Sequence, residues 1–566
     1  MLGNFKRKIK NWFKSSYKNQ FITPDEIFLD SSNLSGFDTD QFEGRLEKPI
    51  SQIAIKFLLI CFLFLALAYS SKIWALQIKQ GNAYLERSEN NRLRTSLIFS
   101  NRGIISDRNG KELVTNIVSP EGEDFSKRNY PELPGFSHLL GYIKYPTKDK
   151  AGFYWETNFV GQDGVESFYN NSLIGENGLK IVETDALGNI QTQNMTSPPT
   201  DGKSFRLSVD FGVQNKLFEI IKSAVENYKF QGGSGIIIDV ETGEILALTN
   251  FPEYNSTILS EGNDKPSING FIQDPLNPFL NRAISGLYVP GSVIKPFIAI
   301  ASLNENLVSP NKKILSTGSI SIPNPYFPDK PSVFTDWKAH GWVDLIDALA
   351  VSSNVYFYSL GGGYGDQKGL GIEKIEKYLR EFGFGQKSGI DLPGEKIGVI
   401  PNPEWKKKTF GEDDWRLGDT YNTSIGQYGV QFTPIQILRG IAAIANDGTL
   451  LTPSVLKGGV KQSSVPIEIK KEAFAAVKEG MKQAVLRGTA SGLNVSYVQV
   501  GAKTGTAEIG KQSLNSWVTG FFPYENPKYA FVITMERGPR ANSTGGVYVM
   551  RQLFDWMNAN TPEYLK

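Results

Sequence analysis

The longest apolar run of the chain lies near its N-terminus, at residues 53–71, where IAIKFLLICFLFLALAYSS carries Lys56 as its single charge. At 1.5 Å of rise per residue, a helix of about 19 residues comes close to spanning a hydrocarbon core of roughly 30 Å. A buried core helix and a cleaved signal peptide are alternatives, and Ala66-Leu67-Ala68 has the form of a cleavage site. Because about 50 residues precede the run and it exceeds the usual 7 to 15 residues of a signal core, the pattern predicts an uncleaved transmembrane anchor at 51–72.

The segment before this run is polar. Residues 1–20 contain six Lys or Arg and no acidic residue, and residues 21–50 are rich in Asp, Glu, Ser and Gly with little apolar periodicity. An excess of Lys and Arg is typical of the cytoplasmic side of a membrane segment. We therefore predict a cytoplasmic tail at 1–50 and a single-pass protein of the cell membrane, whose residues from 73 onward are extracytoplasmic.

Between the anchor and residue 204 the pattern is weakly periodic. The apolar spacing fades into a charged helical segment over 72–94, and the turn residues at 107–110 between two short apolar runs predict a hairpin over 101–116. Residues 161–178 have a helical centre between glycine turns, and the rest of the stretch is typical of loops. This part is expected to form a module of its own at 73–204.

The pattern changes at about residue 205. Leu217, Ile220 and Ile221 recur at helical spacing, and residues 234–250 form two apolar runs around Thr242-Gly243, which predicts a hairpin. Helices are expected at 292–305, 343–360, 371–382 and 433–447, and three strand-like runs close the chain at 497–505, 515–523 and 528–537. Strands from both ends with helices between them predict an α+β or mixed layered domain at 205–566.

Composition limits the classes of function. A chain of 566 residues is too long for one ordinary core, so several domains are expected. Lys and Arg number 60 against 58 Asp and Glu, and because a nucleic acid binder shows a concentrated basic face, no nucleic acid partner is expected. The one cysteine, Cys61, lies in the apolar run, which excludes an intrachain disulfide, a cysteine-based metal site and thiol redox chemistry.

A candidate nucleophile and base lie in VPGSVIKPF, residues 289–297, where Ser292 and Lys295 are three positions apart. Such a pair shares one face if a helix starts near Ser292, and an amine can activate a serine only if its pKa is lowered, for example by burial. The same spacing also begins at Ser15, Ser309 and Ser454, so the spacing alone indicates little. Only Lys295 precedes an apolar helix able to bury its amine, and Pro296 is tolerated in the first turn of that helix.

Two further groups strengthen this interpretation. Ser352 and Asn354 end an apolar run and can offer a hydroxyl and an amide to one cleft, although Ser-x-Asn is also common at helix ends. Lys503-Thr504-Gly505-Thr506 occurs once, in a strand-like run. A glycine in an edge strand lets the backbone of a ligand come close, with Lys503 and the threonine hydroxyls facing a carboxylate, although Lys-Thr-Gly also suits an ordinary strand edge.

Ser-x-x-Lys, Ser-x-Asn and Lys-Thr-Gly in this order are marks of penicillin-binding proteins and class A β-lactamases. Over about 51–566 the chain resembles the class B penicillin-binding proteins, most closely the elongation-type penicillin-binding protein 2. The resemblance extends to RGIISDRNG, GQDGVESFYNNSL, IIIDVETGEILAL and GQYGVQFTPIQ, and DWKAHGW at 336–342 favours the elongation type. It implies a transpeptidase domain related to serine β-lactamases, with a central antiparallel sheet and a helical cluster, after an elongated pedestal or dimerisation-like module and one transmembrane helix.

The resemblance also implies a mechanism, peptidoglycan D,D-transpeptidation during cell-wall elongation. Ser292 would attack the carbonyl between the two terminal D-alanines of a stem peptide, and an amine of a neighbouring stem peptide would resolve the acyl-enzyme into a cross-link. Lys295 would be the general base, Ser352 a proton relay, and Asn354 a holder of Lys295 and the substrate amide. The substrate-binding residues would be Lys503, Thr504, Gly505 and Thr506, and the backbone N–H groups of Ser292 and Thr506 would form the oxyanion hole.

Ligands and partners follow from the same resemblance. β-Lactams would acylate Ser292, no cofactor is required, and a RodA-like membrane glycosyltransferase would supply the glycan strands. Some elongation-type relatives carry zinc near DWKxHG on Asp, His and Cys ligands. Here Asp336 and His340 are present, but no cysteine exists outside the apolar run, so no metal is expected, and His340 and His138 are interpreted as structural.

Several alternatives share the three motifs. A β-lactamase is generally shorter and lacks a pedestal, a β-lactam sensor needs a cytoplasmic signalling domain larger than 1–50, and a bifunctional enzyme needs a glycosyltransferase module larger than 73–204. The nearest alternative is the septal, division-type class B penicillin-binding protein.

Overall fold

The computed structural model describes the residues 51–85, 93–119, 124–131, 134–150, 154–184, 190–324, 327, 329–411, 414–459, 464–510 and 512–566. The predicted cytoplasmic tail at 1–50 lies outside the described residues. The chain divides into two compact units, Met1–Arg92 and Leu93–Lys566.

The first unit contains the predicted anchor. Helix α2 (Gln52–Trp74) has Ser51 as its N-cap, whose hydroxyl accepts from the N–H of Ile53, and it continues through the π-helical turn η3 (Ala75–Lys79). Together they form a helix of 28 residues that is long and apolar enough to cross a membrane, with none of its side chains buried by other parts of the structure. The charged helical segment predicted to about residue 94 is helical at 81–85, its residues 86–92 lie outside the described residues, and strand β1 begins at Leu93.

The second unit begins with the pedestal, which is richer in strands than expected. Strand β1 (Leu93–Ile98) pairs antiparallel with β9 (Gly178–Thr184), and β9 pairs with β10 (Ile190–Ser197). The prediction of loops in this stretch is therefore wrong. The sequence did not reveal β10 because its described side chains, at 192–197, are all exposed. Such a strand has no buried face, so its sequence shows no alternation of apolar and polar residues.

A second pedestal sheet has the order β11-β2-β3-β4 and contains the predicted hairpin, whose turn lies at 107–110. Its strands are β2 (Ile105–Ser106), β3 (Glu112–Ile117), β4 (Lys127–Asn129) and β11 (Phe205–Arg206). The smaller elements are α4 (Ser137–Leu140), α5 (Gly164–Phe168), α6 (Asn170–Leu173), β5 (Ile143–Lys144), β6 (Thr147–Lys148), β7 (Tyr154–Glu156) and β8 (Val160–Gly161). Helices α5 and α6 confirm the helical centre predicted within 161–178.

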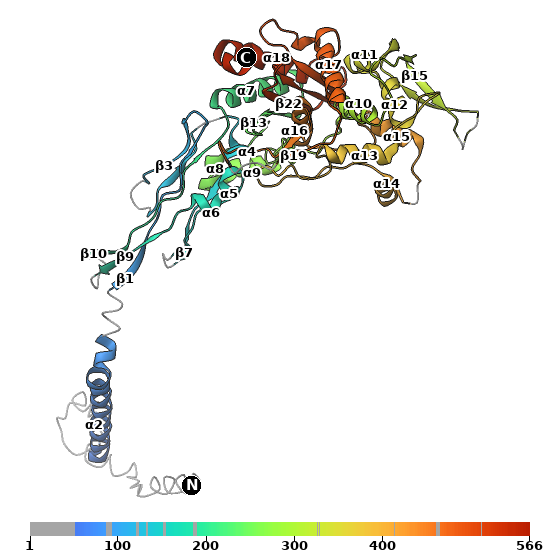
Figure 1. Cartoon of the computed structure of the whole chain (residues 1–566). Helices are drawn as coiled ribbons and strands as arrows, with labels where there is room; N and C mark the ends of the chain where they lie inside the picture. Colours follow the sequence, from blue (N-terminus) through green and yellow to red (C-terminus); the bar gives the residue numbers. More distant parts are fainter. Residues whose placement is uncertain are drawn as a thin grey trace, which may run out of the picture. The chain divides into compact units, whose positions relative to one another are not determined.

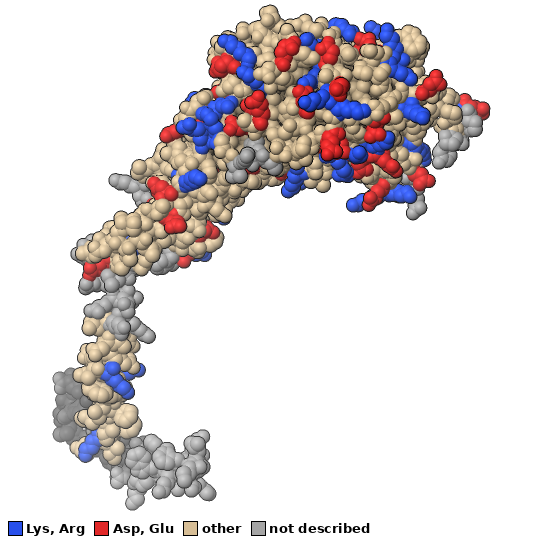
Figure 2. All heavy atoms as spheres, in the orientation of Figure 1, with Lys and Arg blue, Asp and Glu red and all other residues tan. Residues whose placement is uncertain are grey.

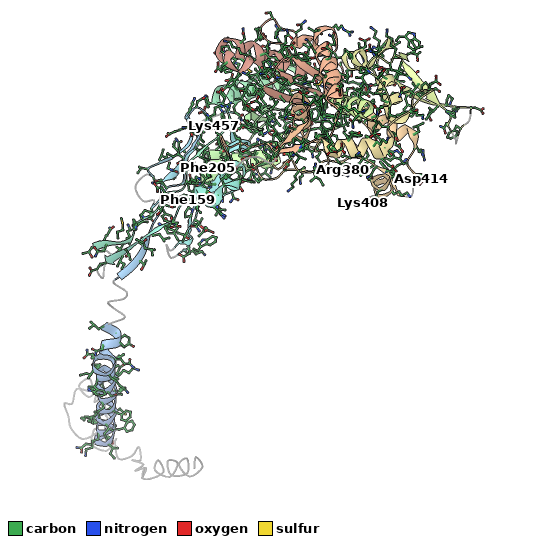
Figure 3. All side chains as sticks on the ribbon, viewed as in Figure 1. Phe159, Phe205, Arg380, Lys408, Asp414 and Lys457 are labelled. Carbon is green, nitrogen blue, oxygen red and sulfur yellow. The ribbon has the colours of Figure 1, made fainter. Side chains whose placement is uncertain are left out.

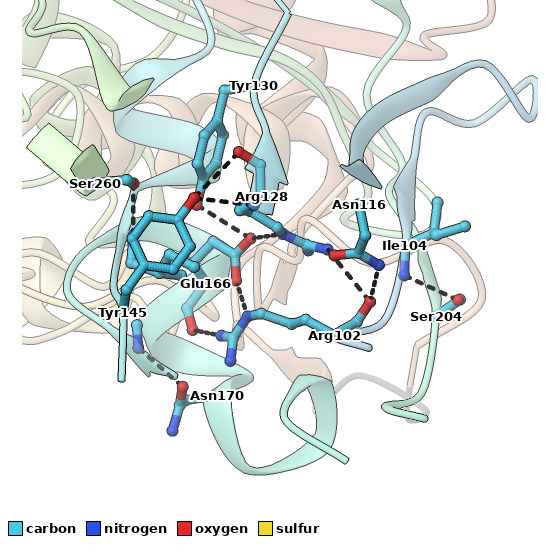
Figure 4. Close-up of polar contacts among 12 residues, drawn as sticks. Arg102, Ile104, Asn116, Arg128, Tyr130, Tyr145, Glu166, Asn170, Ser204 and Ser260 are labelled. Carbon is cyan, nitrogen blue, oxygen red and sulfur yellow. Dashed lines mark hydrogen bonds and ion pairs between the residues drawn. The ribbon is translucent and has the colours of Figure 1, made fainter. Parts of the chain in front are cut away.

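A buried ion network holds this sheet to α5 (Figure 4). The carboxylate of Glu166 accepts from Nε of Arg102 and, at 2.7 Å, from Nε of Arg128, and all three side chains are buried. Burial alone would raise the pKa of Glu166, but the two guanidinium groups outweigh it and hold that pKa below its usual value. Asn116 completes the network, donating to the Arg102 carbonyl at 2.6 Å and accepting from Arg128 at 3.0 Å.

Substitution Glu166→Gln is expected to lower the free energy of unfolding by about 3 to 5 kcal/mol, because it leaves two buried guanidinium groups without their counter-charge. Urea denaturation of the full-length chain in detergent measures the effect. Glu219→Gln is the matched control, since its ion pair with Lys216 is solvent-exposed, and it is expected to change stability by less than about 1 kcal/mol. Equal effects of the two substitutions would contradict the importance of the buried network.

The turn of the predicted hairpin joins the pedestal to the domain that follows. Asp107 accepts from the N–H groups of Asn109 and Lys111 at 2.8 Å each, and from the N–H of Phe211 at 3.2 Å. Lys457 donates to the carbonyl of Arg108 at 2.9 Å, at the place labelled in Figure 3. The RGIISDRNG segment thus docks against the C-terminal domain, both at its beginning and near Lys457.

The C-terminal domain contains the predicted central antiparallel sheet, with the order β13-β12-β22-β21-β20. Its strands are β12 (Gly232–Asp239), β13 (Ile245–Phe251), β20 (Gly501–Ile509), β21 (Ser513–Phe522) and β22 (Tyr529–Pro539). The hairpin predicted at 234–250 is β12-β13, and the three predicted strand-like runs correspond to β20, β21 and β22, although the first of them starts only at Gly501. The two ends of the domain therefore meet in one sheet.

Helices cover both faces of this sheet (Figure 1). Helices α7 (Phe211–Tyr228) and α18 (Gly546–Asn560) pack on one face, and α16 (Pro434–Ala445) packs on the other, next to a helical cluster. Ile236 and Ile238 face the helical cluster, whereas Ile237 faces α7 and α18, as the period of two requires. Since both faces are buried there, parts of β12, β13 and β22 read as continuous apolar runs.

The helical cluster confirms the helices predicted at 371–382 and 433–447. The first of these is α13 (Gly371–Glu381), and the other helices are α10 (Lys295–Asn304), α11 (Leu345–Ala350), α12 (Asn354–Gly362), α14 (Pro403–Phe410), α15 (Leu417–Ser424) and α17 (Lys471–Arg487). The remaining elements are α8 (Ser256–Glu261), α9 (Lys265–Gln273), η4 (Gly291–Ile294), β14 (Ile314–Ser316), β15 (Ser319–Ile322), β16 (Ser332–Thr335), β17 (Gly341–Val343), β18 (Thr449–Leu451), β19 (Ser464–Pro466), η5 (Ser491–Leu493) and η6 (Pro562–Leu565). The chain ends in α18 and η6, so the prediction that strands close it is wrong.

The surface of residues 93–566 carries both signs of charge. Figure 2 shows Lys and Arg interspersed with Asp and Glu over the visible face. Such mixing is typical of an ordinary soluble surface and gives this face no single-sign field that would steer a polyanion.

Candidate active site

Ser292 lies in a tight turn before a buried helix. It belongs to the 3₁₀ turn η4, and α10 begins at Lys295 with Pro296 in its first turn, as predicted. Gly291 has φ +57°, and its N–H donates to the carbonyl of Gly426 at 3.0 Å, which anchors the turn from the opposite loop. Ser292 is partly exposed whereas the rest of η4 is buried, so the hydroxyl-bearing residue of the turn is the one that reaches solvent.

Lys295 is fully buried and has three acceptors. Its Nζ donates to the carbonyl of Ser352 at 2.8 Å, to Oδ1 of Asn354 at 2.7 Å and to Oγ of Ser352 at 3.3 Å. Burial lowers its pKa to about 7, against a smaller opposing effect of the Asp336 carboxylate. A substantial fraction of the Lys295 amine is therefore neutral at neutral pH, as a general base requires.

The stretch predicted to be helical over 343–360 forms two helices, and the Ser-x-Asn segment lies in the break between them. Helix α11 ends at Ala350 and α12 begins at Asn354, with the Ser353 hydroxyl accepting from the N–H of Tyr356 as its N-cap. Ser352 has φ +60°, a left-handed conformation that is uncommon for a residue with a side chain and that occurs often at functional sites. This turn directs the carbonyl, the hydroxyl and the Asn354 amide toward Lys295.

Lys503 reaches the same hydroxyl from the sheet. It lies on β20, the edge strand predicted for it, is fully buried, and donates to Oγ of Ser352 at 2.9 Å and to the carbonyl of Thr504 at 3.0 Å. Burial lowers its pKa well below the usual value, and the nearby Lys295 adds to this effect. Thr504 pairs with the hydroxyl of Thr489 at 2.6 Å, and Thr506 is exposed.

Gly505 is required at its position by contacts within the chain, which the sequence did not predict. A Cβ placed on it would lie 2.7 Å from the carbonyl oxygen of Pro290, so the missing side chain makes room for η4 of the same chain as well as for any ligand. A Cβ placed on Gly291 would likewise lie 2.7 Å from the carbonyl of Thr506. These close approaches bring the backbones of Ser292 and Thr506, the predicted oxyanion-hole residues, next to one another.

The structure thus brings together three motifs that are far apart in the sequence. The hydroxyl of Ser352 lies between the amines of Lys295 and Lys503, with the turn of Ser292 on one side and the edge strand on the other. Sequence reasoning missed two contributors to this site. These are Thr489, which pairs with Thr504, and Gly426, which anchors the serine turn.

The two histidines lie outside this set of contacts. His138 is buried against the ring of Tyr254, and burial lowers its pKa to about 3, so it is neutral. His340 packs on Trp337 and lies 3.7 Å from Oδ1 of Asp336. Among the described residues, no group of three or more His, Cys, Asp or Glu side chains is arranged to hold a metal ion.

Two sequence profiles match the chain. That of the penicillin binding protein transpeptidase domain covers residues 233–554, and that of the penicillin-binding protein dimerisation domain covers residues 119–207. The chain belongs to the penicillin-binding protein transpeptidases.

Relatives and a solved structure narrow the type of penicillin-binding protein. The peptidoglycan D,D-transpeptidase MrdA of Acinetobacter baumannii is 32% identical over 464 residues, covering 76% of this chain and 66% of that protein. MrdA of Haemophilus influenzae is 27% identical over 487 residues, covering 79% and 72%. The penicillin-binding protein PBP2 of Helicobacter pylori, solved in complex with MreC, superposes with a TM-score of 0.69 at 27% identity, covering 83% of this chain and 99% of that one.

These findings confirm the predicted family, fold class and enzyme class. This penicillin-binding protein is of the elongation type within class B, and its enzyme class is peptidoglycan D,D-transpeptidase. The septal type is not favoured, because the relatives named above are MrdA proteins.

Proposed function

We propose that Ser292 of this penicillin-binding protein is the nucleophile of acyl transfer on peptidoglycan stem peptides. The neutral amine of Lys295 takes the proton of Ser292, whose Oγ bonds to the carbonyl carbon between the two terminal D-alanines. The oxyanion that forms is stabilised by the backbone N–H groups of Ser292 and Thr506. The C–N bond then breaks, and Ser352 passes a proton to the leaving D-alanine amine.

The second half of the reaction transfers the acyl group to an acceptor. The amine of a neighbouring stem peptide attacks the ester, Ser292 leaves with its proton restored, and a cross-link results. Asn354 holds Lys295 and the substrate amide, and the terminal carboxylate of the donor lies against Lys503, Thr504 and Thr506 beside Gly505. No cofactor takes part.

One observation carries this assignment of roles. The hydroxyl of Ser352 accepts from both buried amines, at 3.3 Å from Lys295 and 2.9 Å from Lys503. Two lysines buried within reach of one hydroxyl are costly for a fold, because each loses its hydration. Their joint presence supports a proton relay between the base and the leaving group, since a merely structural cluster would not need two titratable amines.

The proposal extends to the setting of the reaction. The helix Gln52–Lys79 supports a membrane-anchored protein, and we place a single-pass anchor at 51–72, the pedestal at 73–204 and an extracytoplasmic transpeptidase domain at 205–566. Because a monofunctional transpeptidase needs glycan strands made by another enzyme, a RodA-like membrane glycosyltransferase is the proposed partner. The relative from Helicobacter pylori was solved with MreC, which supports assembly with further proteins of the cell-wall machinery.

Covalent labelling by a fluorescent penicillin tests the proposed function. The full-length chain in detergent should gain one label that survives denaturation, and heat-denatured protein should gain none. A native chain that gains no more label than the denatured control would refute the function. Rapid turnover of the chromogenic β-lactam nitrocefin would instead indicate a β-lactamase.

The rate of acylation should depend on pH through Lys295. The base acts in its neutral form, so the rate should rise as pH increases through about 7, the pKa to which burial lowers this amine. An ordinary lysine would place this rise near pH 10.4. Acylation rates measured between pH 5 and 9 check the prediction, and a rate that is flat across pH 7 would contradict it.

A further inference from the structure

The catalytic Ser-x-Asn turn is held from one side by residues 335–337. Asn354 Nδ2 donates to the carbonyl of Thr335 at 3.3 Å, and Trp337 Nε1 donates to the carbonyl of Val351 at 3.2 Å. Between these two bonds lies Asp336, whose carboxylate also contacts the turn. A left-handed conformation such as that of Ser352 is strained for a residue with a side chain and persists only where its surroundings fix it, which these contacts do.

The side chain of Asp336 is completely buried, and its carboxylate is fully occupied. Oδ2 accepts from the hydroxyl of Ser353 at 2.8 Å, from the N–H of Val355 at 3.0 Å and from the hydroxyl of Ser316 at 3.3 Å, while Oδ1 accepts from the N–H of Trp337 at 2.9 Å. Ser353 is the N-cap of α12 and Val355 lies in its first turn. A carboxylate is favourable at this end of a helix because the unpaired N–H groups carry partial positive charge.

The same carboxylate acts electrostatically on the buried amine of Lys295. The titratable groups that face Lys295 are Asp336 from the segment before β17, Lys503 from β20 and His340 from the same segment as Asp336. His340 has its pKa lowered by burial, with Asp336 opposing and Lys338 and Lys295 adding to the lowering, so it is neutral near pH 7. Asp336 therefore supplies negative charge where two amines surround one hydroxyl.

We propose that Asp336 is a positioning residue for acyl transfer, whose carboxylate holds the turn of Ser352 and Asn354 against Lys295. The inference rests on the proposed role of Lys295 as base and goes beyond it. Asp336 would act through Ser353 and the first turn of α12, without touching the substrate.

The test compares Asp336→Asn with the wild-type chain, full-length in detergent, by the rate of acylation with a fluorescent penicillin between pH 5 and 9. The substitution should lower the maximal rate on the order of 10²-fold, because the turn that carries Ser352 and Asn354 loses its support. The rise of the rate with pH should move to lower pH by several tenths of a unit or more, because the amine loses the charge that stabilises its protonated form.

Two further variants separate positioning from general damage. Asp336→Glu keeps the charge but not the geometry, so its rate should fall while the rise stays near the wild-type pH. Asp391→Asn is the matched control, since Asp391 likewise accepts from a hydroxyl, Ser454 at 2.8 Å, and from an N–H, Val455 at 2.7 Å, but does not act on Lys295. It should lower the melting temperature while leaving the rate and pH profile of the folded protein unchanged.

The inference is overturned if Asp336→Asn matches the wild type in rate, or if its rate falls with no shift of the pH profile. It is also overturned if a chelator lowers the wild-type rate and zinc restores it, because Asp336 would then act as a metal ligand. These results can be distinguished from failure of the proposed function. If that function is wrong, the wild type is not acylated at any pH, and both the proposed function and the role of Asp336 are refuted.

Discussion

Replacing Ser292 by alanine should abolish covalent labelling of the chain by penicillin, a loss of more than about 10⁴-fold in acylation rate. The acyl-enzyme is an ester of the serine oxygen, and no neighbouring group can take its place, because Lys295 is buried behind the turn and already donates to Ser352 and Asn354. The fold should be retained, since Ser292 is the partly exposed member of an otherwise buried turn.

The chain contains its own control for this experiment. Ser309 begins another Ser-x-x-Lys sequence, ending at Lys312, and both residues are exposed. Ser309→Ala should therefore label like the wild type. If Ser292→Ala retains label, or if Ser309→Ala loses it, the assignment of the nucleophile is wrong.

Replacing Lys295 by methionine should lower the acylation rate by about 10² to 10⁴-fold, the usual contribution of a general base. Methionine fills a similar volume without a charge, and because a buried ammonium is costly, the melting temperature should stay the same or rise. Loss of rate without loss of stability would mark the amine as functional. Stopped-flow or gel-based acylation rates, with a thermal melt of each variant, provide both readouts.

Lys312→Met is the matched control for that substitution, because Lys312 is the exposed partner of Ser309. This substitution should change neither the acylation rate nor the melting temperature. A Lys295→Met variant that acylates within a few-fold of the wild type would show that another group takes the serine proton, and Lys503, which reaches the same Ser352 hydroxyl, would be the next candidate.

The parts of the fold that sequence patterns predicted correctly are those with strong periodicity. Helix α7 and the β12-β13 hairpin follow directly from the spacing of their buried residues, and the turn around Thr242-Gly243 marks the reversal. Strand β10 was missed because its described side chains are all exposed, so only pairing with β9 defines it. Local patterning cannot reveal a strand whose partner determines it.

In the candidate site, too, local patterns predicted some features, whereas others depend on tertiary contacts. Ser292 and Lys295 could be selected by the apolar helix behind them, and the low pKa of Lys295 follows from that burial. The break at Ser352 could not be predicted, because it interrupts an apolar run that reads as one helix and is held open by contacts with residues 335–337. The role of Asp336 in these contacts likewise depends on tertiary structure.

Of the four serines with Ser-x-x-Lys spacing, Ser292 alone is expected to be the acylated nucleophile. Intact mass of the full-length chain after exposure to benzylpenicillin, followed by peptide mapping of the adduct, tests it most directly. We expect one adduct per chain, on the peptide that contains Ser292, and none on peptides that contain Ser15, Ser309 or Ser454. An adduct on any other residue, or no adduct on natively folded protein, would contradict it.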